Sequence, residues 1–328
     1  MTTTAVNYLN IGLMFLAAAI AFVLPFELFL FAYAVLGPLH YLTEIHWLHE
    51  RKYFTNNQKD YFLLVFLCVF VFLFSFVFKE GISLVHNLIF IAFFSALAMV
   101  LFKKFIPKLI FLVVLFFSAL VFSENRAYLL FFAVFLPTII HVFIFTGAFI
   151  LYGAMKSRSF SGIASLIVFI VLSLSFFLWK VDFDWYATSS YVQKSFVESG
   201  FHNLNIEIMN LVQIGSETKS TVLTSSLGMS VMRFIAFAYT YHYLNWFSKT
   251  SIIGWHKISR RNLAILVLIW LLSIGLYAYN YKTGLIALYF LSMLHVFLEF
   301  PLNYRSFIGI GSETLSLFGY KPAIQQGK

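Results

Sequence analysis

The sequence predicts an all-α integral membrane protein, a bundle of about ten transmembrane helices with both ends of the chain in the cytoplasm. Of its 328 residues, 61% are hydrophobic, 20% are aromatic and only 11% are charged. The mean hydropathy is +0.89, which is not the composition of a soluble domain. Almost every residue lies in an apolar run or a short connection. We therefore expect a single transmembrane domain over residues 1–328, in a cell membrane, which is the inner membrane if the source is a bacterium.

The helices are expected where about 20 apolar residues follow one another, because that length crosses the hydrocarbon core. The ranges are 8–24, 26–48, 61–78, 82–102, 109–123, 127–152, 162–180, 222–247, 262–281 and 284–302. No Lys or Arg precedes the first run, and a second run follows it almost directly. This pattern indicates a membrane helix and not a cleaved signal peptide.

The connections differ in charge and in length. Those after the even-numbered helices, together with the C-terminal tail, hold fifteen Lys and Arg residues, whereas the opposite side holds six. The positive-inside rule places the richer side in the cytoplasm. One long connection, residues 181–221, should lie outside and can form an interfacial helix over Ser195–Leu211, with His202 at its surface. The net charge of +9 fits contact with anionic membrane lipids, and we exclude nucleic acid as a partner.

Four of the nine histidines share a depth in the membrane. Even-numbered helices run from outside to inside, so the distance to the next basic residue measures depth. That distance is eleven, fifteen, seven and ten residues for His40, His141, His242 and His295. At 1.5 Å per residue these values span about 12 Å, so the four side chains are within reach of one site. His46, His49, His86 and His256 fall outside this register.

Imidazoles that converge from several helices are the usual ligands of iron, copper or zinc. Glu44 and Glu299 follow His40 and His295 by four residues, one helical turn, and each can accept the second N–H of a ligating ring. Tyr239 lies on the same face as His242 and is a candidate for the substrate wall. Two other interpretations stay open: the His–Glu pairs are buried packing contacts, or they form a proton path. Cys68, the only cysteine, excludes a disulfide framework and an iron–sulfur site.

At these residues the chain resembles the bacteriorhodopsin-related-protein family (Brp/Blh), membrane enzymes that cleave β-carotene to retinal. The family's G-L-P-H-G-x-x-D motif is similar to Gly37-Pro38-Leu39-His40 followed by Glu44, and its late P-H-x-x-x-D motif is similar to His295-Val-Phe-Leu-Glu299. His141 corresponds to an isolated middle histidine. The H-S-x-R-H motif resembles the segment from Tyr241 to Trp246, where His242 is kept and Trp246 replaces the second histidine.

The resemblance implies a dioxygenase that uses Fe(II) and O₂ to cleave an apolar carotenoid. It implies His40, His141, His242 and His295 as the iron ligands. We take Glu44, Glu299 and Tyr239 as candidate catalytic residues, Tyr239 because it shares a face with His242. A carotenoid or lipid hydroxylase or desaturase is an alternative, although only His46-x-x-His49 approaches the histidine boxes of such enzymes. A proton-coupled transporter and a haem protein are further alternatives.

Overall fold

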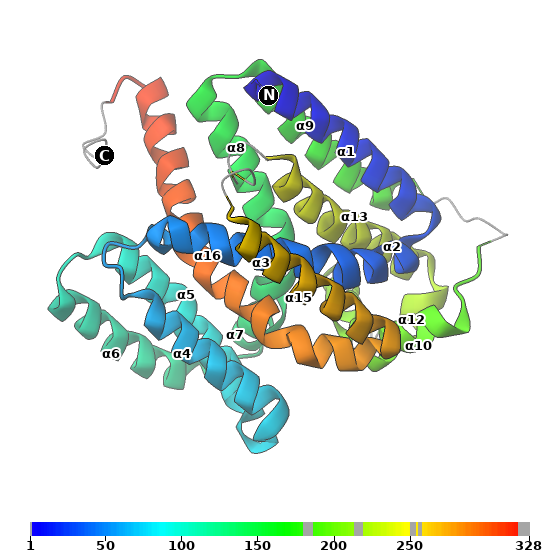
Figure 1. Cartoon of the computed structure of the whole chain (residues 1–328), viewed down its shortest axis with the longest axis horizontal. Helices are drawn as coiled ribbons and strands as arrows, with labels where there is room; N and C mark the ends of the chain where they lie inside the picture. Colours follow the sequence, from blue (N-terminus) through cyan, green and yellow to red (C-terminus); the bar gives the residue numbers. More distant parts are fainter. Residues whose placement is uncertain (1, 180–185, 213–218, 250–253, 255–257, 321–328) are drawn as a thin grey trace. The chain divides into compact units, whose positions relative to one another are not determined.

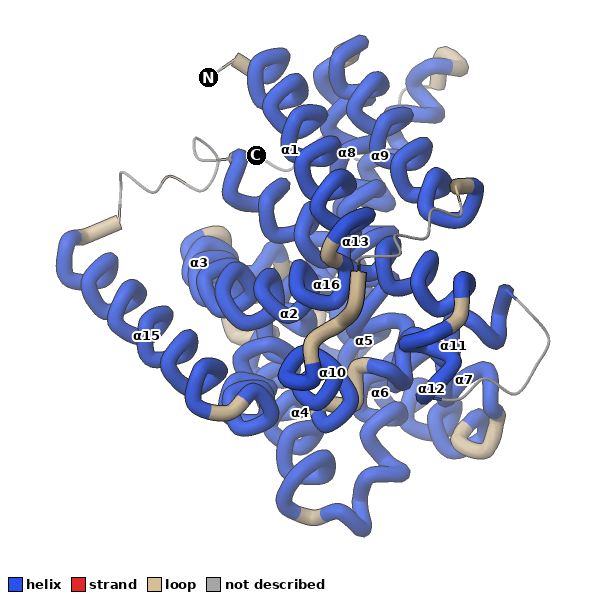
Figure 2. The backbone as a smooth tube through the Cα atoms, turned by 90° about the vertical axis from the view of Figure 1, so that its right-hand side faces the viewer, coloured by secondary structure: helices blue, strands red, loops and turns tan. Residues whose placement is uncertain are grey.

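The protein is helical throughout the residues that its computed structural model describes, which are 2–179, 186–212, 219–249, 254 and 258–320. No strand occurs within these ranges, and short loops join the helices (Figures 1 and 2). The prediction of an all-α polytopic membrane bundle is confirmed. Residues 181–185 and 213–218 of the long connection lie outside the described part of the chain.

Seven helical segments of the described chain are long and apolar enough to cross a membrane. They are Thr3–Val23, Pro25–Glu50, Phe105–Phe122, Arg126–Ser157, Phe160–Leu178, Arg260–Tyr279 and Tyr281–Leu317. Three further helical segments cover the other ranges expected from the sequence: Tyr61–Val77, Val85–Leu101 and Ser226–Ser248. The first two are short, and polar side chains lower the hydropathy of the third. The protein is therefore a membrane protein, while the count of ten spans stays a prediction.

The chain forms two compact units, and the first comprises residues 1–43 and 167–292. Its centre is α13 (Ser226–Ser248), against which α1 (Thr3–Val23) and α2 (Pro25–Phe31) pack. Buried polar groups join α13 to α1, because Asn10 Nδ2 donates to Ser248 Oγ at 3.0 Å and the Tyr241 hydroxyl donates to Asn10 Oδ1 at 3.2 Å. The remaining elements of this unit are η1 (Ala32–Leu36), α10 (Ser190–Glu198), α11 (His202–Val212), α12 (Lys219–Thr224) and α15 (Arg260–Tyr279).

The second unit comprises residues 44–166 and 293–328. Neighbouring helices pack in sequence order, α4 (Tyr61–Phe72) on α5 (Val85–Leu101) and α5 on α6 (Phe105–Phe122). A long helical segment follows, composed of α7 (Arg126–Leu130), η5 (Phe131–Phe145) and α8 (Thr146–Ser157). The π-helical η3 (Leu73–Val77) continues α4, and the short 3-10 helices η2 (Lys52–Phe54) and η4 (Lys79–Leu84) complete the unit. Three helices, α3 (Gly37–Glu50), α9 (Phe160–Leu178) and α16 (Tyr281–Leu317), have residues in both units.

The structure corrects three expectations. The helix expected over Ser195–Leu211 is two helices, α10 and α11, because Gly200 adopts a positive φ of 76° between them. His202 was expected at the surface but is buried, because α11 packs on α13. The last helix was expected to end at residue 302, where the apolar run stops, yet α16 continues to Leu317. A helix that reaches the membrane boundary has no physical reason to end there.

The turn between α15 and α16 depends on a close approach at Gly284. A Cβ atom at this position would lie 2.7 Å from the Tyr277 ring and 2.8 Å from the Tyr277 backbone nitrogen, which cannot move aside cheaply. We expect Gly284→Ala to lower the free energy of unfolding by about 1–3 kcal/mol. Gly275→Ala is the matched control, because a Cβ there meets nothing within 4 Å. Thermal unfolding in detergent measures both, and equal melting temperatures would contradict the packing described here.

Candidate metal centre

His40 stands just after a break in helical register. In η1 the Gly37 N–H donates to the Ala32 carbonyl, five residues back, and Pro38 has no N–H to continue an α-helical pattern. Side chains satisfy carbonyls of this segment: Trp270 Nε1 donates to the Val35 oxygen at 2.8 Å, and the Tyr281 hydroxyl donates to the Leu30 oxygen at 2.9 Å. Side-chain hydrogen bonds therefore stabilise the break in register, and the break sets the direction in which the His40 side chain points from α3.

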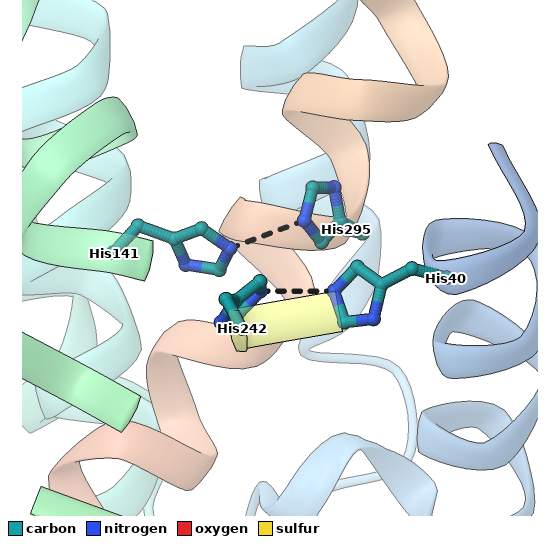
Figure 3. Close-up of side chains that lie close together, drawn as sticks. All are labelled: His40, His141, His242 and His295. Atoms are coloured by element: carbon teal, nitrogen blue, oxygen red, sulfur yellow. Dashed lines mark hydrogen bonds between the residues drawn. The ribbon is translucent and has the colours of Figure 1, made fainter. Parts of the chain in front are cut away.

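His40 and His242 form a buried pair in the first unit. Their Nε2 atoms are 3.1 Å apart, and their exposed fractions are 1% and 7% (Figure 3). The ring of Tyr243 lies 5.1 Å from that of His40, and the ring of Trp246 lies 5.7 Å away. Trp246 is itself fixed, because its Nε1 donates to Thr43 Oγ1 at 2.9 Å. Aromatic side chains thus pack against this pair.

His141 and His295 form a second buried pair, in the second unit. Their Nε2 atoms are also 3.1 Å apart, and their exposed fractions are 2% and 5% (Figure 3). His141 lies in η5, a π-helical segment that contains Pro137, whereas His295 lies in α16. Single-turn π-helical segments in α-helices are frequent at functional sites. The five-residue η1 before His40 has this length, whereas η5 around His141 extends over fifteen residues.

Glu299 contacts a different histidine from the one that the sequence predicted. Its Oε2 lies 3.1 Å from Nδ1 of His141, and both side chains are 2% exposed. The spacing had predicted that Glu299 orients His295, one turn earlier on the same helix. The carboxylate reaches the facing helix η5 instead, because residues four apart share a face but their side chains can point across it. Nδ1 is the nitrogen that a ring bound through Nε2 leaves free for such a contact.

The four histidines belong to one group, in which a ring nitrogen of each lies within 4.8 Å of the others. The geometry of a metal site fits this group. Two imidazole nitrogens bound at about 2.0–2.1 Å to one ion lie about 2.9–3.4 Å apart at the usual angles, and the two measured separations of 3.1 Å fall in this range. Buried imidazoles aimed at each other through Nε2 are a donor set that suits a transition metal.

The other candidate residues have varied positions. Glu44 is buried, one turn after His40 on α3, and its exposed fraction is 2%. The ring of Tyr239 packs against Phe29 at 5.1 Å and Tyr33 at 6.1 Å, so it belongs to an aromatic cluster adjoining Tyr243.

Three of the histidines outside the predicted register, His46, His49 and His86, make contacts outside the four-histidine group. His46 is 3.6 Å from Glu50, and His49 contacts the Tyr53 hydroxyl at 2.9 Å. His86 packs against the ring of Tyr128, and His256 lies outside the described residues.

Two supporting residues were not found from the sequence. Thr43 fixes Trp246, and Trp270 satisfies the backbone beside His40. Trp270 lies in α15, a helix whose apolar side chains are largely exposed, and such a helix gives no sequence signal for one functional indole. Thr43 is directly adjacent to Glu44, which is the only signal that could have drawn attention to it.

No protein-family model matches the sequence, no curated protein is similar to it, and no solved structure resembles it. The buried histidine group therefore stands on its own geometry: a membrane-embedded helical protein with four histidines that can hold a metal ion.

Metal content should depend on all four histidines. We expect purified protein to hold about one transition-metal ion per chain, and His→Ala at position 40, 141, 242 or 295 to remove most of it. His49→Ala should retain the metal, because that side chain is exposed and contacts Tyr53. Elemental analysis by mass spectrometry measures the content. Full metal content in the double variant His141→Ala/His295→Ala would show that the second pair takes no part.

Glu299 should tune the metal affinity through His141. Glu299→Gln keeps the shape of the side chain but removes its charge, so we expect the metal to bind about 10–100-fold more weakly while the fold is kept. Glu50→Gln is the control. Glu50 is exposed, and its carboxylate lies 3.6 Å from His46, which is not one of the four histidines. Competition with a chelator measures the affinity. Equal affinities in the two variants would remove Glu299 from the centre.

Proposed function

We propose that the protein is a membrane-embedded non-haem iron oxygenase that cleaves a carotenoid, β-carotene to retinal, with O₂. The observation that carries the proposal is the buried group of four imidazoles within 4.8 Å of one another. The motif order from Gly37 to Glu299 supports the carotenoid as the substrate class. The proposal places the protein among dioxygenases, with Fe(II) as its cofactor.

Iron is the metal of choice for this chemistry. Imidazole ligands suit zinc, copper, iron and nickel, but zinc has no redox chemistry. An Fe(II) ion would supply the activation of O₂, and His40, His141, His242 and His295 would hold it. Glu299 would keep the His141 ring in the tautomer that leaves Nε2 free, through its contact at Nδ1. Glu44 is proposed for the same role beside His40.

The surroundings suit a long apolar substrate. Tyr243 and Trp246 pack beside His40, and the aromatic cluster of Phe29, Tyr33 and Tyr239 adjoins Tyr243. Aromatic walls bind a polyene through contact area and exclude water from the reaction. Because the helices stand in lipid, such a substrate can reach the protein without passing through water.

A proton relay is the second candidate, and one observation favours it. Each histidine pair is joined by a contact between ring nitrogens, and Glu299 extends the second pair. Chains of titratable groups inside a membrane are typical of proton paths. A pure protein without metal would favour the relay. No contact of His46 or His49 supports the desaturase alternative, since His46 lies beside Glu50 and His49 contacts the Tyr53 hydroxyl.

Carotenoid cleavage can be read by eye. Expression in cells that make β-carotene should bleach their colour and yield retinal, identified by chromatography. The His40→Ala variant, expressed to the same level, should leave the cells coloured, because it removes a ligand. If the iron-loaded wild-type protein leaves β-carotene intact, the proposed substrate is wrong, and a hydroxylated carotenoid as the product would favour the hydroxylase alternative.

A further inference from the structure

Five exposed cations lie on two connections of the second unit, and none of them belongs to the metal centre. We call them the basic surface: Arg51, Lys52, Lys59, Lys103 and Lys104. The acid of these connections, Asp60, is neutralised by Lys108, whose Nζ lies 2.6 Å away in a largely buried ion pair. The only other acid at the end of α3, Glu50, lies 3.6 Å from His46. The basic surface therefore carries a strong local excess of positive charge.

The two connections are fixed to each other by hydrogen bonds. The backbone N–H of Asn56 donates to the Met99 carbonyl at 3.1 Å, and its Nδ2 donates to the Val100 carbonyl at 2.7 Å. Asn57 Nδ2 donates to the Lys103 carbonyl at 3.2 Å. The cations of one connection are thus held beside those of the other, which free loops would not achieve.

The backbone at Lys52 is strained. Lys52, Tyr53 and Phe54 all have positive φ, at 53°, 52° and 56°, a conformation that is unfavourable for residues other than glycine. The surroundings hold it in place: the Tyr53 ring packs on Tyr61 at 4.5 Å, and Arg305 donates to the Phe54 carbonyl. Strain that several specific contacts hold in place is found most often at functional segments. Here it leaves Lys52 exposed beside Arg51.

Apolar side chains stand directly beside these cations. Phe105 and Ile106, which follow Lys104, are 72% and 68% exposed, and Phe62 is 58% exposed. In a membrane protein such side chains face the acyl chains. A ligand that meets both surfaces must therefore be amphiphilic, with an anionic head for the cations and hydrocarbon for Phe105 and Ile106.

We propose that the basic surface is a binding site for the headgroup of an anionic phospholipid. The phosphate contacts the lysines, and the acyl chains lie along Phe105 and Ile106. Clustered cations next to transmembrane helices attract anionic lipid with about 1 kcal/mol for each charge, which is about a fivefold change in affinity. The site is separate from the proposed oxygenase function, so either can fail without the other.

Native mass spectrometry of the full-length protein in detergent tests the proposal, with phosphatidylglycerol as the probe and phosphatidylcholine as the neutral comparison. We expect Lys103→Gln/Lys104→Gln to bind phosphatidylglycerol about 25-fold more weakly. Arg260→Gln/Arg261→Gln is the matched control, an equally exposed basic pair at the start of α15, and should keep the affinity. Equal losses in the two double variants would reduce the effect to net charge and overturn the site.

Two more variants keep the test sharp. Lys103→Arg/Lys104→Arg retains the charge and should retain the lipid. Asn57→Ala changes no charge but unties the connections, so it should weaken binding about threefold. Unchanged binding of phosphatidylglycerol by Asn57→Ala and by Lys103→Gln/Lys104→Gln would contradict the proposal. So would equal binding of phosphatidylcholine, or competition by inorganic phosphate as effective as that of the lipid. Unchanged melting temperatures show that each variant is folded.

Discussion

A polar group inside a bilayer has no water to hydrogen-bond with, so the protein itself must supply its hydrogen-bond partners. This constraint accounts for most of the specific contacts in the structure. Arg233 donates through Nε to the Phe22 carbonyl at 3.1 Å and lies over the Phe22 ring. Asn10 bonds to Ser248 and Tyr241, and the histidines bond to each other. Contacts between apolar side chains cannot distinguish one lipid-facing helix from another, whereas each of these polar contacts fixes a partner.

The same constraint makes the histidine group costly without a purpose. Four buried imidazoles and the buried Glu299 carboxylate replace side chains that would pack more easily as hydrocarbon. A metal ion held by these side chains would compensate a ring nitrogen of each histidine that it binds. Glu299 would offset part of the ion's positive charge and hold His141 in place. The centre is therefore best understood as one electrostatic unit and not as four separate ligands.

The number of residues between each histidine and the next basic residue identified the histidine group, because all helices cross the same thickness of bilayer. Depth below the basic residues was enough to select His40, His141, His242 and His295 from nine candidates. The partner of Glu299 was not predictable in this way, because periodicity shows which face of a helix a residue occupies but not which helix it meets. The break at Gly200 and the burial of His202 were missed for a similar reason: they depend on α11 packing against α13.

In the π-helical segments beside His40 and around His141 the backbone hydrogen bonds span five residues, one more than in the α-helices they interrupt. One residue corresponds to a rotation of about 100° about the helix axis. The segment from Ala32 to Leu36 therefore changes the helical phase: the side chains of α3 point in directions rotated about the helix axis relative to those of α2. A lineage that gained or lost a single codon there would keep a continuous helix and yet present a different face to the bundle. Insertions of this size are usually harmful in a membrane span, but at this place they offer evolution a route to build or dismantle a ligand set in one step.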